Sequence, residues 1–189
     1  QPKGAAGYAA SLSNLANPGT YDATEGTAPS WDAVNGWQFN GSSTYLTTGW
    51  IPTSGCSAIV RVANLNTTSL YLCGVMESGG SSGFMIACET DRLVMWNPSA
   101  NTIPDTYNSS GVFAGVYSAE CYWDAVDLSD DNVGTWANPS TELYIGCYYR
   151  ESDTSRQAYF KSHILAFAIY DILFTSDQVS ALTTAINLL

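Results

Sequence analysis

The 189-residue chain carries 17 acidic and only 6 basic residues, which gives a net charge of −11. Six scattered cations cannot form the basic surface that nucleic acids and anionic membranes require, so we exclude both as partners. No stretch approaches the roughly 18 consecutive apolar residues of a membrane-spanning helix, which argues against membrane insertion.

Apolar residues make up 46% of the chain and charged residues only 12%. The charged share is well below the usual quarter, and glycine, serine, threonine and asparagine replace it. This composition favours one globular domain of short strands and turns with a polar, mostly uncharged surface.

The first residue is Gln1 rather than methionine. We expect that a signal peptide has been removed, and we therefore predict an extracellular location, at a cell surface or on a virion.

Residues 1–16 form a glycine- and alanine-rich arm whose only large apolar residues are Tyr8, Leu12 and Leu15. An arm of this composition is normally disordered unless contacts hold it. It either packs along its own domain or lies on a neighbouring subunit, where it could add a strand to a sheet. We treat residues 17–189 as the folded domain.

Strand patterns recur after a turn-rich stretch at residues 17–35. Residues 36–49 are the clearest hairpin, because Asn40-Gly41 between apolar runs is a strong hairpin signal. Further strands are predicted at residues 57–65, 69–75, 83–89, 92–96, 111–118, 121–127 and 142–147. Regularly spaced short strands predict an all-β antiparallel sandwich of the jelly-roll type.

The last quarter of the chain has the strongest pattern. Residues 163–170 form an apolar strand that we expect to be covered on both faces, with Leu165, Phe167 and Ile169 on one face and Ile164 on the other. Thr175 and Gln178 then form a capping box that starts a helix. An apolar stripe follows along that helix, at Val179, Leu182, Ile186 and Leu189.

The five cysteines are widely spaced and form no CxxC pair, which makes a zinc site improbable. They are either buried small apolar residues or partners in one or two disulfides. The sequence does not separate the two alternatives.

Three segments carry a resemblance to a known family: GWQFNGSSTYLTTG at residues 36–49, LYIGC at residues 143–147, and HILAFAIYDILFTSDQVSAL at residues 163–182. Their order and spacing resemble the concanavalin A-like or laminin-G-like jelly-roll domains of bacterial surface proteins and phage tail proteins. The resemblance implies a jelly roll with a short C-terminal helix. It specifies function poorly, because this scaffold hosts lectins, hydrolases and structural modules.

The chain departs from that family in its late hairpin. Many relatives carry a Y-x-N/D-G turn, whereas this chain has CYWDAVDLSDDNVG at residues 121–134. We place the turn at Trp123-Asp124-Ala125, without the usual glycine.

No catalytic set is complete. Hydrolases of this scaffold place several acids on one strand, but here the only similar run is Glu89-Thr90-Asp91, and its third acid is absent. His163, the single histidine, has no GxSxG serine motif to serve. We therefore expect that the chain is not an enzyme.

A calcium ion is the one cofactor that the sequence favours, because hard oxygen ligands gather in one loop. Its candidate ligands are Asp127, Asp130 and Asp131, although a solvated acidic loop is the better explanation of these residues.

Tryptophans near strand ends and in loops are the candidate glycan-binding residues, namely Trp50, Trp96, Trp123 and Trp136. Each of them could equally pack in the core. Three sequons, at Asn40, Asn66 and Asn108, are candidate glycosylation sites.

These observations predict an extracellular structural module that self-assembles into a surface fibre or a phage-tail-like structure through residues 1–16. The partner would then be further copies of the same chain. The alternative is a lectin-like adhesion module whose partners are glycans.

Overall fold

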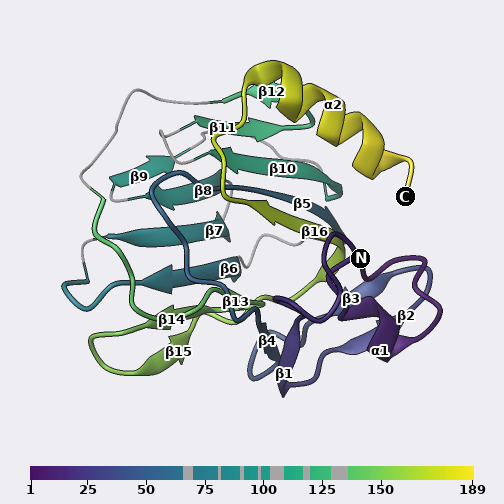
Figure 1. Cartoon of the computed structure of the whole chain (residues 1–189), viewed down its shortest axis with the longest axis horizontal. Coiled ribbons are helices and arrows are strands. Elements are labelled where there is room, and N and C mark those ends of the chain that lie inside the picture. Colours follow the sequence, from purple (N-terminus) through teal and green to yellow (C-terminus); the bar gives the residue numbers. More distant parts are fainter. Residues whose placement is uncertain are drawn as a thin grey trace.

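The computed structural model describes residues 1–65, 70–80, 82–89, 92–97, 99–102, 109–116, 120–128 and 136–189. These residues form two sheets packed face to face, antiparallel except where β14 runs parallel to β6, with one short helix near each end of the chain (Figure 1). The fold is the predicted all-β sandwich with a C-terminal helix. No helix in the described ranges is long and apolar enough to span a membrane.

The first sheet contains, in spatial order, β1 (Thr24–Thr27), β4 (Tyr45–Thr47), β13 (Tyr144–Ile145), β6 (Leu70–Met76), β7 (Gly83–Glu89), β8 (Arg92–Asn97) and β9 (Ser99–Thr102), with β14 (Tyr148–Arg150) and β15 (Ser155–Gln157) beside β6. The second contains β12 (Val126–Asp127), β11 (Glu120–Trp123), β10 (Gly111–Val116), β5 (Ser57–Ala63), β16 (His163–Tyr170), β3 (Gly36–Gln38) and β2 (Ser30–Asp32).

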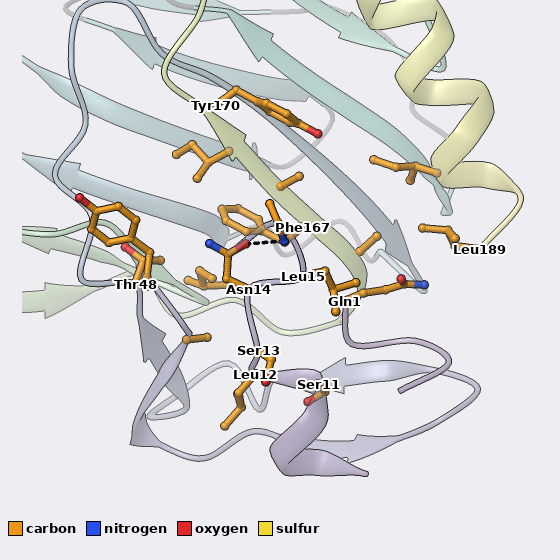
Figure 2. A pocket seen from close by; sticks show the side chains of 18 of the residues that line it. Gln1, Ser11, Leu12, Ser13, Asn14, Leu15, Thr48, Phe167, Tyr170 and Leu189 are labelled. Atoms are coloured by element: carbon orange, nitrogen blue, oxygen red, sulfur yellow. Dashed lines mark hydrogen bonds between the residues drawn. The ribbon is translucent and has the colours of Figure 1, made fainter. Parts of the chain in front are cut away.

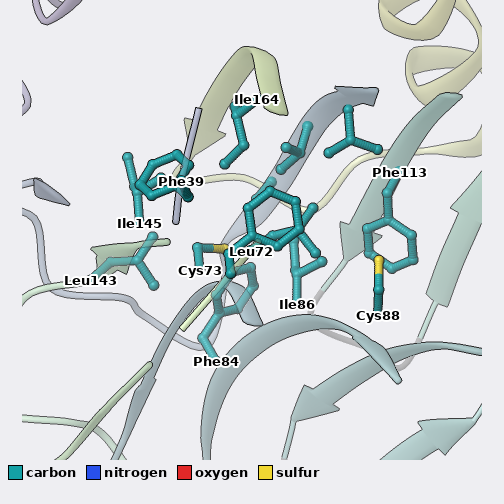
Figure 3. Close-up of a cluster of buried hydrophobic side chains, with 14 of the residues drawn as sticks. Phe39, Leu72, Cys73, Phe84, Ile86, Cys88, Phe113, Leu143, Ile145 and Ile164 are labelled. Atoms are coloured by element: carbon teal, nitrogen blue, oxygen red, sulfur yellow. The ribbon is translucent and has the colours of Figure 1, made fainter. Parts of the chain in front are cut away.

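The main core fills the space between the two sheets (Figure 3). Phe84 and Ile86 of β7 face Phe113 of β10, and all three side chains are fully buried. The pleat of the backbone directs every second side chain of these strands into the main core, and the residues between them are also apolar and buried, on the outer faces of the sheets. Burial of this apolar area is the main source of stability for such a sandwich.

A second, smaller core lies on the outer face of the second sheet, under α2 (Ser176–Asn187). Val179 and Ile186 of this helix pack over Ile59 of β5. The predicted capping box is confirmed, because Thr175 and Gln178 exchange side-chain-to-backbone hydrogen bonds. The other short helix, α1 (Tyr8–Ser11), belongs to the N-terminal arm.

The side-chain alternation predicted for the last strand is wrong at its first half. A bulge in the pairing of β16 with β5 falls between Ile164 and Ala166. Ile164 therefore joins Phe167 and Ile169 at the main core, while Ala166 faces the α2 side. One inserted residue, Leu165, is enough to reverse the phase, because the side-chain period of a strand is two.

The hairpin predicted at residues 36–49 is also wrong, because its two strands, β3 and β4, belong to different sheets. Asn40 Oδ1 accepts backbone hydrogen bonds from Ser42 and Ser43, which makes a local turn without strand pairing. Phe39 N and Gly41 N instead donate to carbonyl oxygens of residues 162 and 160. Asparagine side chains stabilise such turns as readily as they stabilise hairpins.

The turn predicted at residues 123–125 is confirmed between β11 and β12. Asp124 and Ala125 have φ angles of 48° and 66°, the left-handed pair that a two-residue hairpin requires. Asp124 also accepts a hydrogen bond from Val112 N at 2.9 Å, which holds it in place without a glycine.

All five cysteines are buried and form no disulfide. Burial raises the pKa of the Cys56 and Cys147 thiols to about 12. The first of the two sequence-based alternatives, buried small apolar residues, is therefore the one that the structure shows.

Candidate functional site

The N-terminal arm lies along its own domain. Lys3 N donates to Leu165 O at 3.0 Å, and the Trp31 indole donates to Pro2 O at 2.7 Å. Tyr8 and Leu12 pack against the main core, whereas Leu15 is 66% exposed. Of the three predicted assembly residues, only Leu15 therefore offers a largely exposed side chain.

A cavity of about 550 Å³ opens beside β16 (Figure 2). We call it the edge cavity. Arm residues 11–16 form one wall together with Trp50, and Leu182 and Ile186 at the end of α2 form another. Residues 166–170 of β16 all line it. No acidic or basic side chain of the described residues does so, which makes the lining apolar with a few neutral polar groups.

The predicted tryptophan platform does not gather on the described surface. Trp123 is only 8% exposed and belongs to the main core. Trp50 and Trp136 are partly buried against the same core, and Trp50 also lines the edge cavity. Trp96 lies in β8, and its side chain is outside what the structure describes.

Of the predicted calcium ligands, Asp127 lies exposed in β12, and Asp130 and Asp131 are outside the described residues. The described part of the chain holds no group of three potential metal ligands. Asp32, another acid near the N-terminus, is held by Asn35, whose side-chain and backbone hydrogen bonds lower the pKa of its carboxyl group.

Among the sequons, Asn40 is exposed, but its side-chain oxygen is engaged in the turn described above. Asn66 and Asn108 lie outside the described residues. Of the catalytic candidates, His163 Nδ1 is 3.2 Å from Asn64 Nδ2 at the start of β16. For the pair Glu89 and Asp91, the structure describes only the backbone of Glu89, and Asp91 lies outside the described residues.

The structure brings together four tyrosines that the sequence analysis did not single out. Tyr144 of β13 stacks on Tyr45 of β4, with ring centroids 5.6 Å apart, and on Tyr149 of β14, at 5.0 Å. Tyr159 meets Tyr45 at 6.5 Å. Since Leu46 and Ile145 point into the main core, Tyr45 and Tyr144 project from the opposite face of the first sheet.

One cation completes this group, which we call the tyrosine cluster (Tyr45, Tyr144, Tyr149, Tyr159 and Arg156). The guanidinium carbon of Arg156 lies 4.9 Å from the centre of the Tyr45 ring. Arg156 is exposed and makes no ion pair with any described residue. Nearby Arg150, by contrast, is paired with Asp153 at 3.6 Å.

The chemistry of the tyrosine cluster differs from that of the edge cavity. Tyr45, Tyr149 and Tyr159 are half-buried, so each exposes part of an apolar ring near a polar hydroxyl. Burial raises the pKa of the Tyr144 hydroxyl, as does the carboxylate of Glu142.

No protein family and no curated protein matches this sequence. Solved structures of similar fold include the native heptameric SAP-like pentraxin from Limulus polyphemus, with a TM-score of 0.58 and 13% identity over 77% of this chain and 80% of that one. They also include a Trypanosoma rangeli sialidase in complex with sialic acid, with a TM-score of 0.58 and 14% identity over 86% of this chain. The K-to-G mutant of the NanB sialidase from Streptococcus pneumoniae has a TM-score of 0.57 and 13% identity over 76% of this chain.

The chain spans only 29% of the Trypanosoma sialidase and 26% of the NanB chain. These matches contradict the expectation that the chain is not an enzyme, because solved structures of similar fold are sialidases. At 12–15% identity the likeness shows the fold alone and transfers no catalytic residue.

Proposed function

We propose that this chain is an extracellular β-sandwich module that binds carbohydrate through the tyrosine cluster, and that its ligand is a sugar bearing a carboxylate. The observation that carries the proposal is the placement of the Arg156 guanidinium, which makes no ion pair with a described residue, over the Tyr45 ring and beside the stacked Tyr144 and Tyr149.

The physical argument combines two features of the cluster. Tyrosine rings pack against the C–H groups of a sugar while their hydroxyls bond its oxygens. An arginine binds a carboxylate with two parallel hydrogen bonds. Arg156 is exposed and makes no ion pair with a described residue, so its positive charge is available to an anionic ligand beside the tyrosine rings.

The structural comparisons support a sugar ligand. One sialidase of similar fold was solved with sialic acid, which is a sugar with a carboxylate. Its identity to this chain is 14% and the match spans 29% of that chain, so the comparison suggests a class of ligand and transfers no binding residue.

A glycan array carrying acidic and neutral glycans tests the proposal. We expect the wild-type chain to retain acidic glycans, and we expect Arg156→Ala and Tyr149→Ala each to lose them. Tyr21→Ala is the matched control, because Tyr21 is 57% exposed and lies outside the cluster. Absence of any acidic-glycan signal, or unchanged binding by both cluster variants, would overturn the proposal.

A second function is favoured by the exposed apolar side chains around the edge cavity. Leu15, Tyr21, Tyr170 and Leu189 are all exposed and all line it. A concentration of this kind marks an interaction surface. We therefore also propose that the module is part of a surface or tail-like assembly joined on the side where the arm lies. A strictly monomeric mass by light scattering at high protein concentration would count against this second function.

A further inference from the structure

The edge cavity lies at the edge of β16 rather than over one of its faces. Successive side chains of a strand point to opposite faces, so a cavity above one face is lined by every second residue. Here five consecutive residues, 166–170, line the same cavity. Only the hydrogen-bonding edge of the strand can present all five residues to the same cavity.

This edge lacks a paired strand among the described residues. On one side, β16 pairs with β5 along its length. On the other side it pairs with β3 only at His163 and Ile164, and Lys3 N bonds Leu165 O. Residues 166–170 follow with neither a charge nor a proline, the devices that usually protect a free edge.

We propose that the edge cavity receives an extended, uncharged segment of another polypeptide, which adds a strand to the second sheet beside residues 166–170. Five strand residues extend over about 17 Å, so a segment of similar length would pair along the whole free edge. The inference is independent of sugar binding, because the edge cavity and the tyrosine cluster share no residue.

The chemistry of the cavity selects this occupant. Since the side chains of the described residues that line the cavity are apolar or neutral, a charged side chain of the occupant would be desolvated there without a side-chain counter-charge. A purely apolar small molecule would displace water from the free peptide groups of β16 and leave them without hydrogen-bond partners. An extended peptide fills the apolar space and also pairs these groups.

The space available favours one strand over a whole second sheet. The arm at residues 11–16 and α2, through Leu182 and Ile186, both line the cavity. Its volume of about 550 Å³ is enough for a short extended segment and far too small for a second copy of the whole sandwich to enter.

A pair of synthetic peptides tests the proposal with the full chain. The first is an acetylated, amidated heptapeptide of alternating threonine and valine, and the second is the same peptide with alternate backbone nitrogens methylated. Side chains are identical, so the comparison isolates the strand hydrogen bonds. We expect the first to bind about tenfold more tightly, the effect of one or two lost hydrogen bonds, and to protect from hydrogen exchange those amides of residues 166–170 that point away from β5.

Equal affinity for the two peptides would overturn the proposal and identify an apolar cavity for small molecules. Absence of binding by both, or protection confined to other strands, would overturn it as well. A charged variant adds a second readout. Leu15→Lys should weaken binding of the unmethylated peptide. Val34→Lys should leave the affinity for this peptide unchanged, because Val34 is 70% exposed and lies outside the cavity lining.

Discussion

The buried indole nitrogen of Trp37 donates a hydrogen bond of 2.8 Å to the hydroxyl oxygen of Ser11. That hydroxyl donates in turn to the carbonyl oxygen of Tyr8 at 2.6 Å. The arm and the main core are thereby linked through one side chain that is almost fully buried. Removing residues 1–16 would expose this part of the core, so the arm contributes to the stability of the domain whether or not it also contacts a neighbour.

Ser11→Ala should lower the free energy of unfolding by about 1–3 kcal/mol, because it leaves the Trp37 indole nitrogen buried without an acceptor. Urea denaturation followed by tryptophan fluorescence measures the change. Ser13→Ala is the matched control, since its hydroxyl has no hydrogen bond among the described residues, and it should change stability by less than about 0.5 kcal/mol. Equal effects of the two variants would contradict the role of Ser11.

Arm docking should weaken at alkaline pH. Burial raises the pKa of the Tyr8 hydroxyl to about 12, and the negative charge of Glu25 adds to this effect. A raised pKa in the folded state means that the neutral hydroxyl is the form the fold favours. Its contribution is complete below pH 10, the ordinary tyrosine pKa, and is lost as the pH rises toward 12.

Tyr8→Phe removes that titration. We expect hydrogen exchange of residues 1–16 to accelerate between pH 10 and 12 in the wild type beyond its ordinary base-catalysed rise, and to accelerate less in Tyr8→Phe. Other buried tyrosines titrate in both proteins, so the difference between the two profiles isolates Tyr8. Parallel profiles would show that Tyr8 ionisation does not affect arm docking.

Gly146→Ala should be strongly destabilising. Its φ is +86°, and an added Cβ would lie 2.2 Å from Cε1 of Phe39 in the main core. Overpacking and backbone strain together should cost about 3 kcal/mol or more. Gly80→Ala is the control, because Gly80 has a φ of +71° but nothing within 4 Å of the added atom. Thermal unfolding should show a much smaller loss there, and similar losses would contradict the packing argument.

The five thiols should not react with a thiol reagent in the native protein. Burial raises the pKa of the Cys56 thiol to about 12, so almost no thiolate is present at pH 8. Labelling with a disulfide reagent should modify none of the five natively and all five in guanidinium chloride. Rapid native labelling of any of them would contradict the burial that the structure shows.

The sequence predicted the sandwich, the C-terminal capping box and the turn at Asp124 because each leaves a pattern within a short stretch of the chain. It failed where a local signal had two structural solutions. Asn40-Gly41 suits a hairpin and an isolated turn equally well, and only contacts with residues 160–162 decide between them. The bulge at Leu165 likewise reflects its partner strand, β5.

The tyrosine cluster was missed for a related reason. Tyr45 and Tyr144 are separated by almost a hundred residues and meet only because β4 and β13 are neighbours in the first sheet. The tryptophans drew the sequence analysis instead, and the described ones pack against the core. The high number of tyrosines, twelve in the chain, was the one available signal.

An NMR titration with methyl glucuronide and methyl glucoside tests the central claim most directly, because the two sugars differ only in a carboxylate. The account predicts that the glucuronide shifts the ring signals of Tyr45, Tyr149 and Tyr159 to saturation, and that the glucoside binds at least about tenfold more weakly. Equal shifts with both sugars, or glucuronide shifts confined to residues outside the tyrosine cluster, would contradict it.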